Sequence, residues 1–416
     1  MARKCRETYI KFNKYRLNIS FFTLSTFVVS LIYILPVFKI KIPYVISGVL
    51  MLSFIPYIYI KEIKIRKYIN ILVFSSFSIF LVQVLLGTYG FVDAFNEMIR
   101  NLRFFIPVLW SVYILKNVSN DNVRIFYVLY IVLIMIIIFK TYNALNENQW
   151  ISRILAQSVL TDTPEIRELR LQNIGGFEFS YMVGLINICF FWSYFYNVDK
   201  RKKLIYLILT IISYMYIIKT MYTTLLLLTS LSLVIILIKN VKNILAKILT
   251  FLIFLIIVWN YADIVYFLSE LFNGSLLSNK FMQIYMALTE GGMESLGSRP
   301  ELIMNSISAW LSNPIFGGRP ENLNSHSMFF GLLATNGIFG ILLLIVVFYL
   351  SYKVIVGELI KKGIDTLLIK ICFMYIILLM IFNPINYVFE ITIAGFYFSV
   401  LCIFTNFYFL RKKLIL

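Results

Sequence analysis

The residue types that could do chemistry in this chain are concentrated in residues 297–340, which include the only histidine, His326. The candidates there are Arg299, Gly317, Gly318, Arg319 and His326. Histidine can accept a proton near neutral pH, and arginine offers a planar fork of donors to phosphate oxygens. Paired glycines let the backbone approach a ligand closely and expose N–H groups to an anion. The segment therefore predicts a site that binds an anionic group and moves a proton.

A helix is expected to carry the first of these residues. Ser298 fits an N-cap, Pro300 fits the first turn, and Glu301 completes a capping box. Apolar residues then recur at helical spacing until Asn313-Pro314, which favours an amphipathic helix on the outer membrane surface. Capping explains Glu301 without catalysis, so it is a secondary candidate. Arg299 gains nothing as a cap, and an anionic partner at this helix start would explain it.

The next candidates also have plainer interpretations. The run Gly317-Gly318-Arg319 fits an ordinary turn with a headgroup-binding arginine, and Glu321 nearby is a second secondary candidate. His326 precedes an apolar run for which Asn324 or Ser325 is the expected N-cap, and the helix N-terminus would keep the imidazole neutral. A hydrogen-bonded surface histidine remains the alternative. Gly331, Gly337 and Gly340 in that run predict close helix packing.

A second basic segment lies in residues 141–176. It carries Arg167 and Arg170 and ends in Gly175-Gly176, so it could face the first segment across a site. Asp162, Glu165 and Glu168 lie in the same segment and make a solvated loop of mixed charge the alternative. No closely spaced carboxylate pair stands beside a histidine, so no metal site is predicted.

The rest of the chain must position these residues within a membrane. The 416 residues are 60% hydrophobic and only 14% charged, whereas soluble domains carry about 25% charged residues. The net charge of +18 comes from short Lys and Arg clusters between apolar runs, which is the topology pattern of membrane proteins and not a nucleic-acid surface. The cysteines form no close-spaced pair, which predicts free thiols, buried where they lie in apolar runs.

About twelve spans are expected from apolar runs of membrane-crossing length. They are placed at 20–38, 43–60, 69–87, 102–118, 123–140, 177–197, 203–219, 221–238, 244–262, 326–350, 367–385 and 388–409. Most Lys and Arg residues then fall on one side, which favours both termini in the cytoplasm. The fold expected is all-α, with residues 1–416 as a single membrane domain. The larger outer loops are 88–101, 141–176 and 263–325, and the last two form the site.

The segment 297–340 resembles the signature region of the O-antigen polymerase and O-antigen ligase superfamily. His326-Ser327, nine further residues and Gly337-Ile338-Phe339-Gly340 match the histidine pattern of the ligases. Upstream, an arginine, a helix, Asn313-Pro314 and the glycine pair 317–318 match as well. Outside 297–340 the likeness is limited to span number and loop placement, and the surroundings of Arg170 lack the fuller family pattern.

The resemblance implies a bacterial glycosyltransferase of the inner or plasma membrane, with its active site on the extracytoplasmic face. It implies transfer of a growing glycan from undecaprenyl pyrophosphate to a hydroxyl of the next lipid-linked repeat unit, inverting and without metal or cofactor. His326 would be the base, and Arg319, Arg299 and Arg170 would hold the pyrophosphate, with Arg167 a secondary candidate. The products would be O-antigen of lipopolysaccharide, capsule or exopolysaccharide.

Two rival functions stay open at the level of sequence. A ligase would use the same residues to move finished glycan to a different acceptor. A flippase for lipid-linked oligosaccharide, or another transporter, would also suit about twelve spans, although charged residues are nearly absent from the middle of the apolar runs. The partners expected are the lipid-linked oligosaccharide, membrane lipids, a chain-length regulator and a flippase, and no nucleic acid.

Overall fold

A computed structural model of the chain describes most, but not all, of its residues. The described ranges are 8–12, 15–19, 21–38, 63–85, 90–102, 120–148, 163–220, 222–241, 259–274, 294–318, 327–361 and 366–382, with isolated residues at 151–154, 243–256, 278–286 and 399. The contacts and distances given for the structure are those of these residues.

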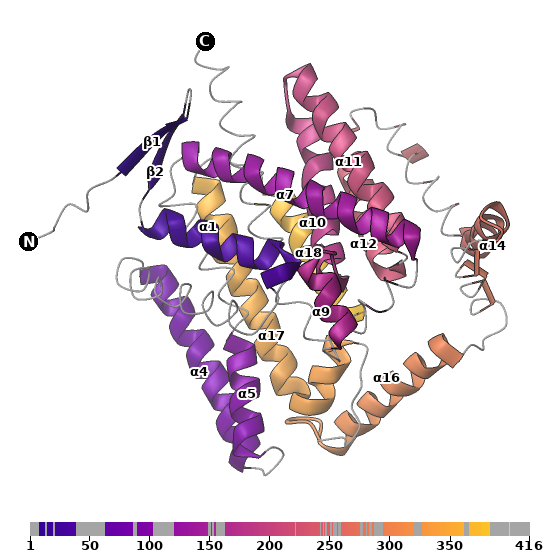
Figure 1. Ribbon diagram of the computed structural model, residues 1–416. Coiled ribbons are helices and arrows are strands. Elements are labelled where there is room, and N and C mark those ends of the chain that lie inside the picture. The colour runs from indigo at the N-terminus through magenta and orange to yellow at the C-terminus, as the bar shows by residue number, and fades with distance from the viewer. Residues whose placement is uncertain are drawn as a thin grey trace, which may run out of the picture.

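Helices dominate the described chain (Figure 1). They are α1 (Phe21–Ile34), η1 (Pro36–Phe38), α4 (Ile63–Leu85), α5 (Phe91–Leu102), α7 (Asn120–Glu147), α9 (Pro164–Leu171), α10 (Phe177–Tyr196), α11 (Lys200–Thr220), α12 (Thr223–Asn240), α14 (Tyr261–Leu271), α16 (Glu294–Ser312), α17 (Met328–Lys361) and α18 (Leu367–Phe382). Among these, α4, α7, α10, α11 and α17 are long and apolar enough to cross a membrane, while α12 and α18 supply shorter apolar helices. The expectation of a mainly helical fold is thereby confirmed, and five helices of this length and composition favour a membrane protein.

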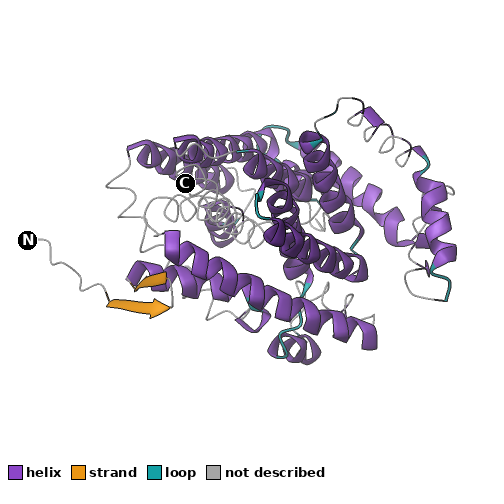
Figure 2. Ribbon diagram, turned by 90° about the horizontal axis from the view of Figure 1, so that it is seen from above, coloured by secondary structure: helices purple, strands orange, loops and turns teal. Residues whose placement is uncertain are grey.

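Two short strands stand outside the all-α expectation. Strands β1 (Thr8–Phe12) and β2 (Tyr15–Ile19) pair antiparallel, with Thr8 opposite Ile19 and Phe12 opposite Tyr15. β-branched and aromatic residues favour extended backbone, but basic residues lie among them, and the sequence analysis predicted no strand here. Figure 2 shows the strands at the edge of the molecule, where β2 lies against α1 and α7.

Most expected spans coincide with helices where the chain is described. The expected span 177–197 agrees with α10 to within a residue, whereas α4 begins six residues before the expected residue 69 and α7 runs beyond both expected ends. The expected span 43–60 lies outside the described residues, as do all but the first residue of 102–118, nearly all of 388–409 and about half of 244–262. The loop expected at 88–101 is wrong, because residues 91–102 form helix α5.

Helix α5 is strongly amphipathic and folds back along α4 (Figure 1). The Phe80 ring of α4 meets the rings of Phe91 and Phe95 edge-on, with centroids 5.4 and 6.3 Å apart. The sequence analysis placed residues 88–101 in a loop, because the polar residues of α5 concealed its apolar face. Edge-to-face aromatic packing therefore holds the hairpin together.

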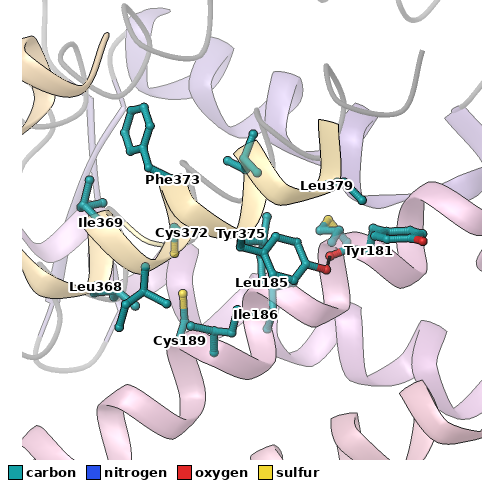
Figure 3. Packing of buried hydrophobic residues seen from close by; sticks show 14 of the residues in the cluster. Tyr181, Leu185, Ile186, Cys189, Leu368, Ile369, Cys372, Phe373, Tyr375 and Leu379 are labelled. Carbon is teal, nitrogen blue, oxygen red and sulfur yellow. Dashed lines mark hydrogen bonds between the residues drawn. The ribbon is translucent and has the colours of Figure 1, made fainter. Parts of the chain in front are cut away.

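Helix α10 lies at the centre of the bundle and is buried along most of its length. A helix that is apolar on all sides is expected in such a position, and α11, α12 and α18 pack around it. Gly184 lets α18 approach, since a Cβ there would lie 2.5 Å from the Tyr375 hydroxyl. Figure 3 shows Cys189 of α10 facing Cys372 of α18. Both thiols are free and buried, as predicted for the cysteines in apolar runs.

Candidate active site

Hydrogen bonds to Asn313 and Pro314 stabilise the loop that follows α16. Asn313 accepts two hydrogen bonds, from the Gly317 N–H to its carbonyl at 2.7 Å and from the Phe316 N–H to its side chain at 3.4 Å. The Trp310 indole donates to the Pro314 carbonyl at 3.0 Å. Gly317 has φ 79°, a left-handed conformation that glycine adopts without strain. The sequence prediction that Asn313-Pro314 ends the helix is confirmed, because α16 ends at Ser312.

Helix α17 is broken at Gly337. This residue has φ 60° and ψ −160°, which is a backbone conformation almost restricted to glycine. The sequence predicted close helix packing at Gly337, but the close approach there is to the backbone of Ile315 and Gly317 in the preceding loop and not to another helix. The break divides α17 into a first part, residues 328–336, and a second part, residues 338–361. Discontinuous membrane helices commonly mark binding sites, because their ends expose backbone groups.

The loop 313–318 docks onto this break through backbone hydrogen bonds. The N–H of Ile338 donates to the Pro314 carbonyl at 3.0 Å, and the N–H of Phe339 donates to the Ile315 carbonyl at 3.1 Å. These donors would otherwise be unsatisfied at the start of the second part of α17. The two glycine motifs, which are about twenty residues apart in sequence, therefore form one structure.

Close approach of the two backbones explains why glycines occupy this contact. A Cβ at Gly317 would lie 2.5 Å from the Thr335 carbonyl carbon, and a Cβ at Gly337 would overlap the Ile315 carbonyl oxygen. Neither neighbour can move aside, because both are backbone atoms. A side chain at position 318 would also be crowded, since a Cβ there would lie 2.7 Å from the Ser312 hydroxyl oxygen.

Ser327 caps the first part of α17. Its carbonyl accepts the Gly331 N–H at 2.9 Å, and its hydroxyl accepts the Phe330 N–H at 3.4 Å. The cap expected at Asn324 or Ser325 is therefore wrong, and the helix begins at Met328. Ser327 is buried and so is fixed by its surroundings as well as by its cap. The helix that follows His326 thus starts two residues later than expected.

Three of the predicted site residues lie outside the described residues: Arg319, Glu321 and His326. They belong to residues 319–326, whose described neighbours are Gly318 and Ser327. Gly318 follows Gly317, which packs against Thr335 of α17, and Ser327 caps the start of α17. Ser327 therefore belongs to the start of α17, while Gly318 lies against Ser312 and Ala309 of α16, one residue after the contact with α17.

Helix α16 carries the other two candidates of this segment. The helix begins at Glu294, so the N-cap predicted at Ser298 and the capping box with Glu301 are wrong. A proline costs a helix one hydrogen bond but does not always mark its first turn. Arg299 therefore lies inside the helix and not at its positively polarised start. Glu301 is exposed on the helix surface.

The second basic segment forms helix α9 and its connection to α10. Thr163 caps α9, its hydroxyl accepting the Ile166 N–H at 3.4 Å. Arg170 in the last turn is half-buried, and Arg167 is exposed. The expected plain loop is thus partly helical. The nearest neighbours of Gly317 and Gly318 belong to α17 and α16.

Tertiary hydrogen bonds fix the connection between α9 and α10. The Val37 N–H donates to the Asn173 side chain at 3.3 Å, and the Gly175 N–H donates to the Thr141 hydroxyl at 2.7 Å. The ammonium group of Lys219 lies 6.0 Å from the centre of the Tyr142 ring, within the range of a cation–π contact. The ends of α1, α7 and α11 and the start of α10 therefore meet at one side of the bundle.

Sequence reasoning missed a buried amide pair next to the break. Gln83 of α4 donates from its side-chain nitrogen to the side-chain oxygen of Asn336, and both side chains are buried. Gly340 leaves space for Asn336, because a Cβ at position 340 would overlap the Asn336 Cβ. The signal in the sequence was an amide side chain within each of two apolar runs, 69–87 and 326–350. Such amides normally pair with one another or with other polar groups when they are buried.

Comparison with protein-family models and with curated protein sequences finds no match for this chain.

Proposed function

We propose that this chain is a polymerase of lipid-linked oligosaccharide repeat units, of the O-antigen polymerase type. The observation that carries the proposal is the docking of loop 313–318 onto the break at Gly337. Two described glycines of the family-like segment, Gly317 and Gly337, thereby meet in one backbone contact. The described residues Gly318 and Ser327 border the segment that carries Arg319 and His326. The described contacts thus account for Gly317 and Gly337 of the signature.

The proposed reaction joins a sugar hydroxyl to the anomeric carbon of the growing glycan. His326 takes the hydroxyl proton, a role that typically contributes about 10² to 10⁴ in rate. The oxygen forms the new glycosidic bond as the bond to pyrophosphate breaks, and attack from the opposite face inverts the anomeric centre. Arg319 and Arg299 meet the negative charge that develops on the leaving pyrophosphate. Arg170 would do so from α9, with Arg167, Glu301 and Glu321 in secondary positions.

The proposed orientation has about twelve spans, with both termini in the cytoplasm and the site facing outward. The meeting of the C-terminal ends of α1, α7 and α11 with the start of α10 supports this alternation, since those ends are all expected outside. The lipid carrier would then reach the site from the outer leaflet of the bacterial membrane. No nucleotide sugar is needed there, because the pyrophosphate link already activates the sugar.

Two alanine variants test the proposal in cells that depend on this protein for their surface polymer. His326→Ala and Arg319→Ala should abolish long-chain polymer while single repeat units persist, because each removes a reacting or charge-stabilising group. The polymer is measured by gel electrophoresis of extracted glycan, and membrane insertion is measured by the amount of full-length protein in the membrane fraction. Gly357→Ala is the control, since a Cβ at that position meets no neighbour. Normal polymer length from either alanine variant would remove that residue from the site.

A further inference from the structure

We propose that Gln83 and Asn336 are positioning residues that hold the break in α17 at a fixed place against α4. The proposal deepens the proposed function, because it concerns the frame of the same site. Gln83 lies outside the family-like signature, and Asn336 is one of the nine unspecified residues within it.

The first step of the argument is the location of the pair. Asn336 is the last residue before Gly337, so its position sets where the second part of α17 begins. The next two N–H groups, of Ile338 and Phe339, are those that hold loop 313–318. A shift of Asn336 would therefore move the donors on which the loop depends.

The second step is the burial of the pair. Asn336 is 4% exposed and Gln83 is 2% exposed. Buried in an apolar bundle, an amide that loses its partner is costly, so the pair disfavours sliding of one helix along the other. Polar residues in this role fix register between helices more than they add stability. Gly340 confines Asn336 further, because it leaves room for that side chain and no more.

A second hydrogen bond between the same two helices supplies a matched comparison. The Tyr68 hydroxyl lies 2.8 Å from the Ser351 hydroxyl, and both residues are buried. It lies about fifteen residues from the Gln83–Asn336 pair on each helix, or roughly 22 Å along the helix axis. Tyr68→Phe thus removes an α4–α17 hydrogen bond without touching the break.

The test uses the purified full-length protein and two measurements. The first is hydrogen exchange of the backbone amides in residues 336–342, and the second is product formation from the lipid-pyrophosphate repeat unit. Gln83→Leu and Asn336→Ala should speed exchange in that segment and lower product formation by about 10-fold to 100-fold, the scale expected for a misplaced reacting group. Tyr68→Phe should leave exchange there unchanged and product formation within about 2-fold. The exchanged pair, Gln83→Asn with Asn336→Gln, keeps both amides and should restore both measurements in large part.

The outcomes separate this inference from the proposed function. Unchanged exchange at 336–342 in Gln83→Leu, or equal losses in Tyr68→Phe and Gln83→Leu, would overturn the positioning role. If the wild-type protein makes no product, the proposed function fails, and the exchange measurement alone still decides whether the pair holds the break. Should Gln83→Leu fail to fold, Gln83→Asn replaces it, because that variant keeps the amide and only shortens its reach.

Discussion

Gly317 and Gly274 show how the same backbone angle can have different consequences at the scale of one residue. Their φ angles are 79° and 81°, so alanine would be strained by a similar amount at either position, about 1–2 kcal/mol. A Cβ at Gly274 meets no atom within 4 Å, whereas one at Gly317 meets the Thr335–Asn336 backbone. Only Gly317 therefore adds a steric cost to the conformational one.

The prediction is that Gly317→Ala lowers both product formation and thermal stability, while Gly274→Ala affects stability slightly and product formation not at all. Forced overpacking costs about 1–3 kcal/mol beyond the strain that both variants share. Thermal unfolding of the purified proteins and a product assay provide the comparison. Equal behaviour of the two variants would mean that the contact with Thr335 has no functional weight.

Among whole elements, the apolar helices were the most predictable. The composition of α10 and α11 alone determines that they form membrane-length helices, because every exposed backbone group in lipid must be paired within the helix. Residues that depend on distant partners were not predictable. The break at Gly337 needs loop 313–318 to receive its free N–H groups, and the cap at Ser327 depends on where that helix packs. The spacing of residues in the sequence indicates neither the docking of loop 313–318 nor the packing of the helix that Ser327 caps.

The candidate site divides in the same way. Its residue types and the end of α16 were readable from the sequence, since Asn313-Pro314 is a local stop signal. The start of α16 was not, because Ser298, Pro300 and Glu301 imitate a helix start within a longer helix. The polar face of α5 similarly suggested a loop, although its apolar face packs against Phe80.

Gly184 provides a test of how α10, α12 and α18 fit together. A Cβ there would crowd the Tyr375 hydroxyl, a Leu225 methyl and the Thr229 hydroxyl, at 2.5, 2.7 and 2.9 Å. Gly184→Ala should therefore destabilise the protein by about 1–3 kcal/mol. Gly357→Ala, with no neighbour within 4 Å, should be neutral or stabilising by up to about 1 kcal/mol, because alanine favours helix more than glycine does. Denaturation in detergent compares the two, and a stable Gly184→Ala protein would contradict the packing described for α10.

Across the whole molecule, the candidate site is attached to a pair of long helices. Helices α4 and α17 run antiparallel and are joined near both ends, by Gln83–Asn336 and by Tyr68–Ser351. The loop 313–318 is fastened to the same pair through the break in α17. A rigid frame of this kind suits a reaction in which two large lipid-linked substrates must meet at one bond.

The measurement that tests the central claim most directly is incubation of the purified protein with its lipid-pyrophosphate repeat unit alone, with products separated by length on a gel. The proposed polymerase should give a ladder of lengths without any nucleotide sugar, and the His326→Ala protein should give none. Transfer only after a different acceptor is supplied would contradict polymerisation and indicate a ligase. A folded protein that is inactive in both assays would contradict glycan transfer altogether and favour a transporter.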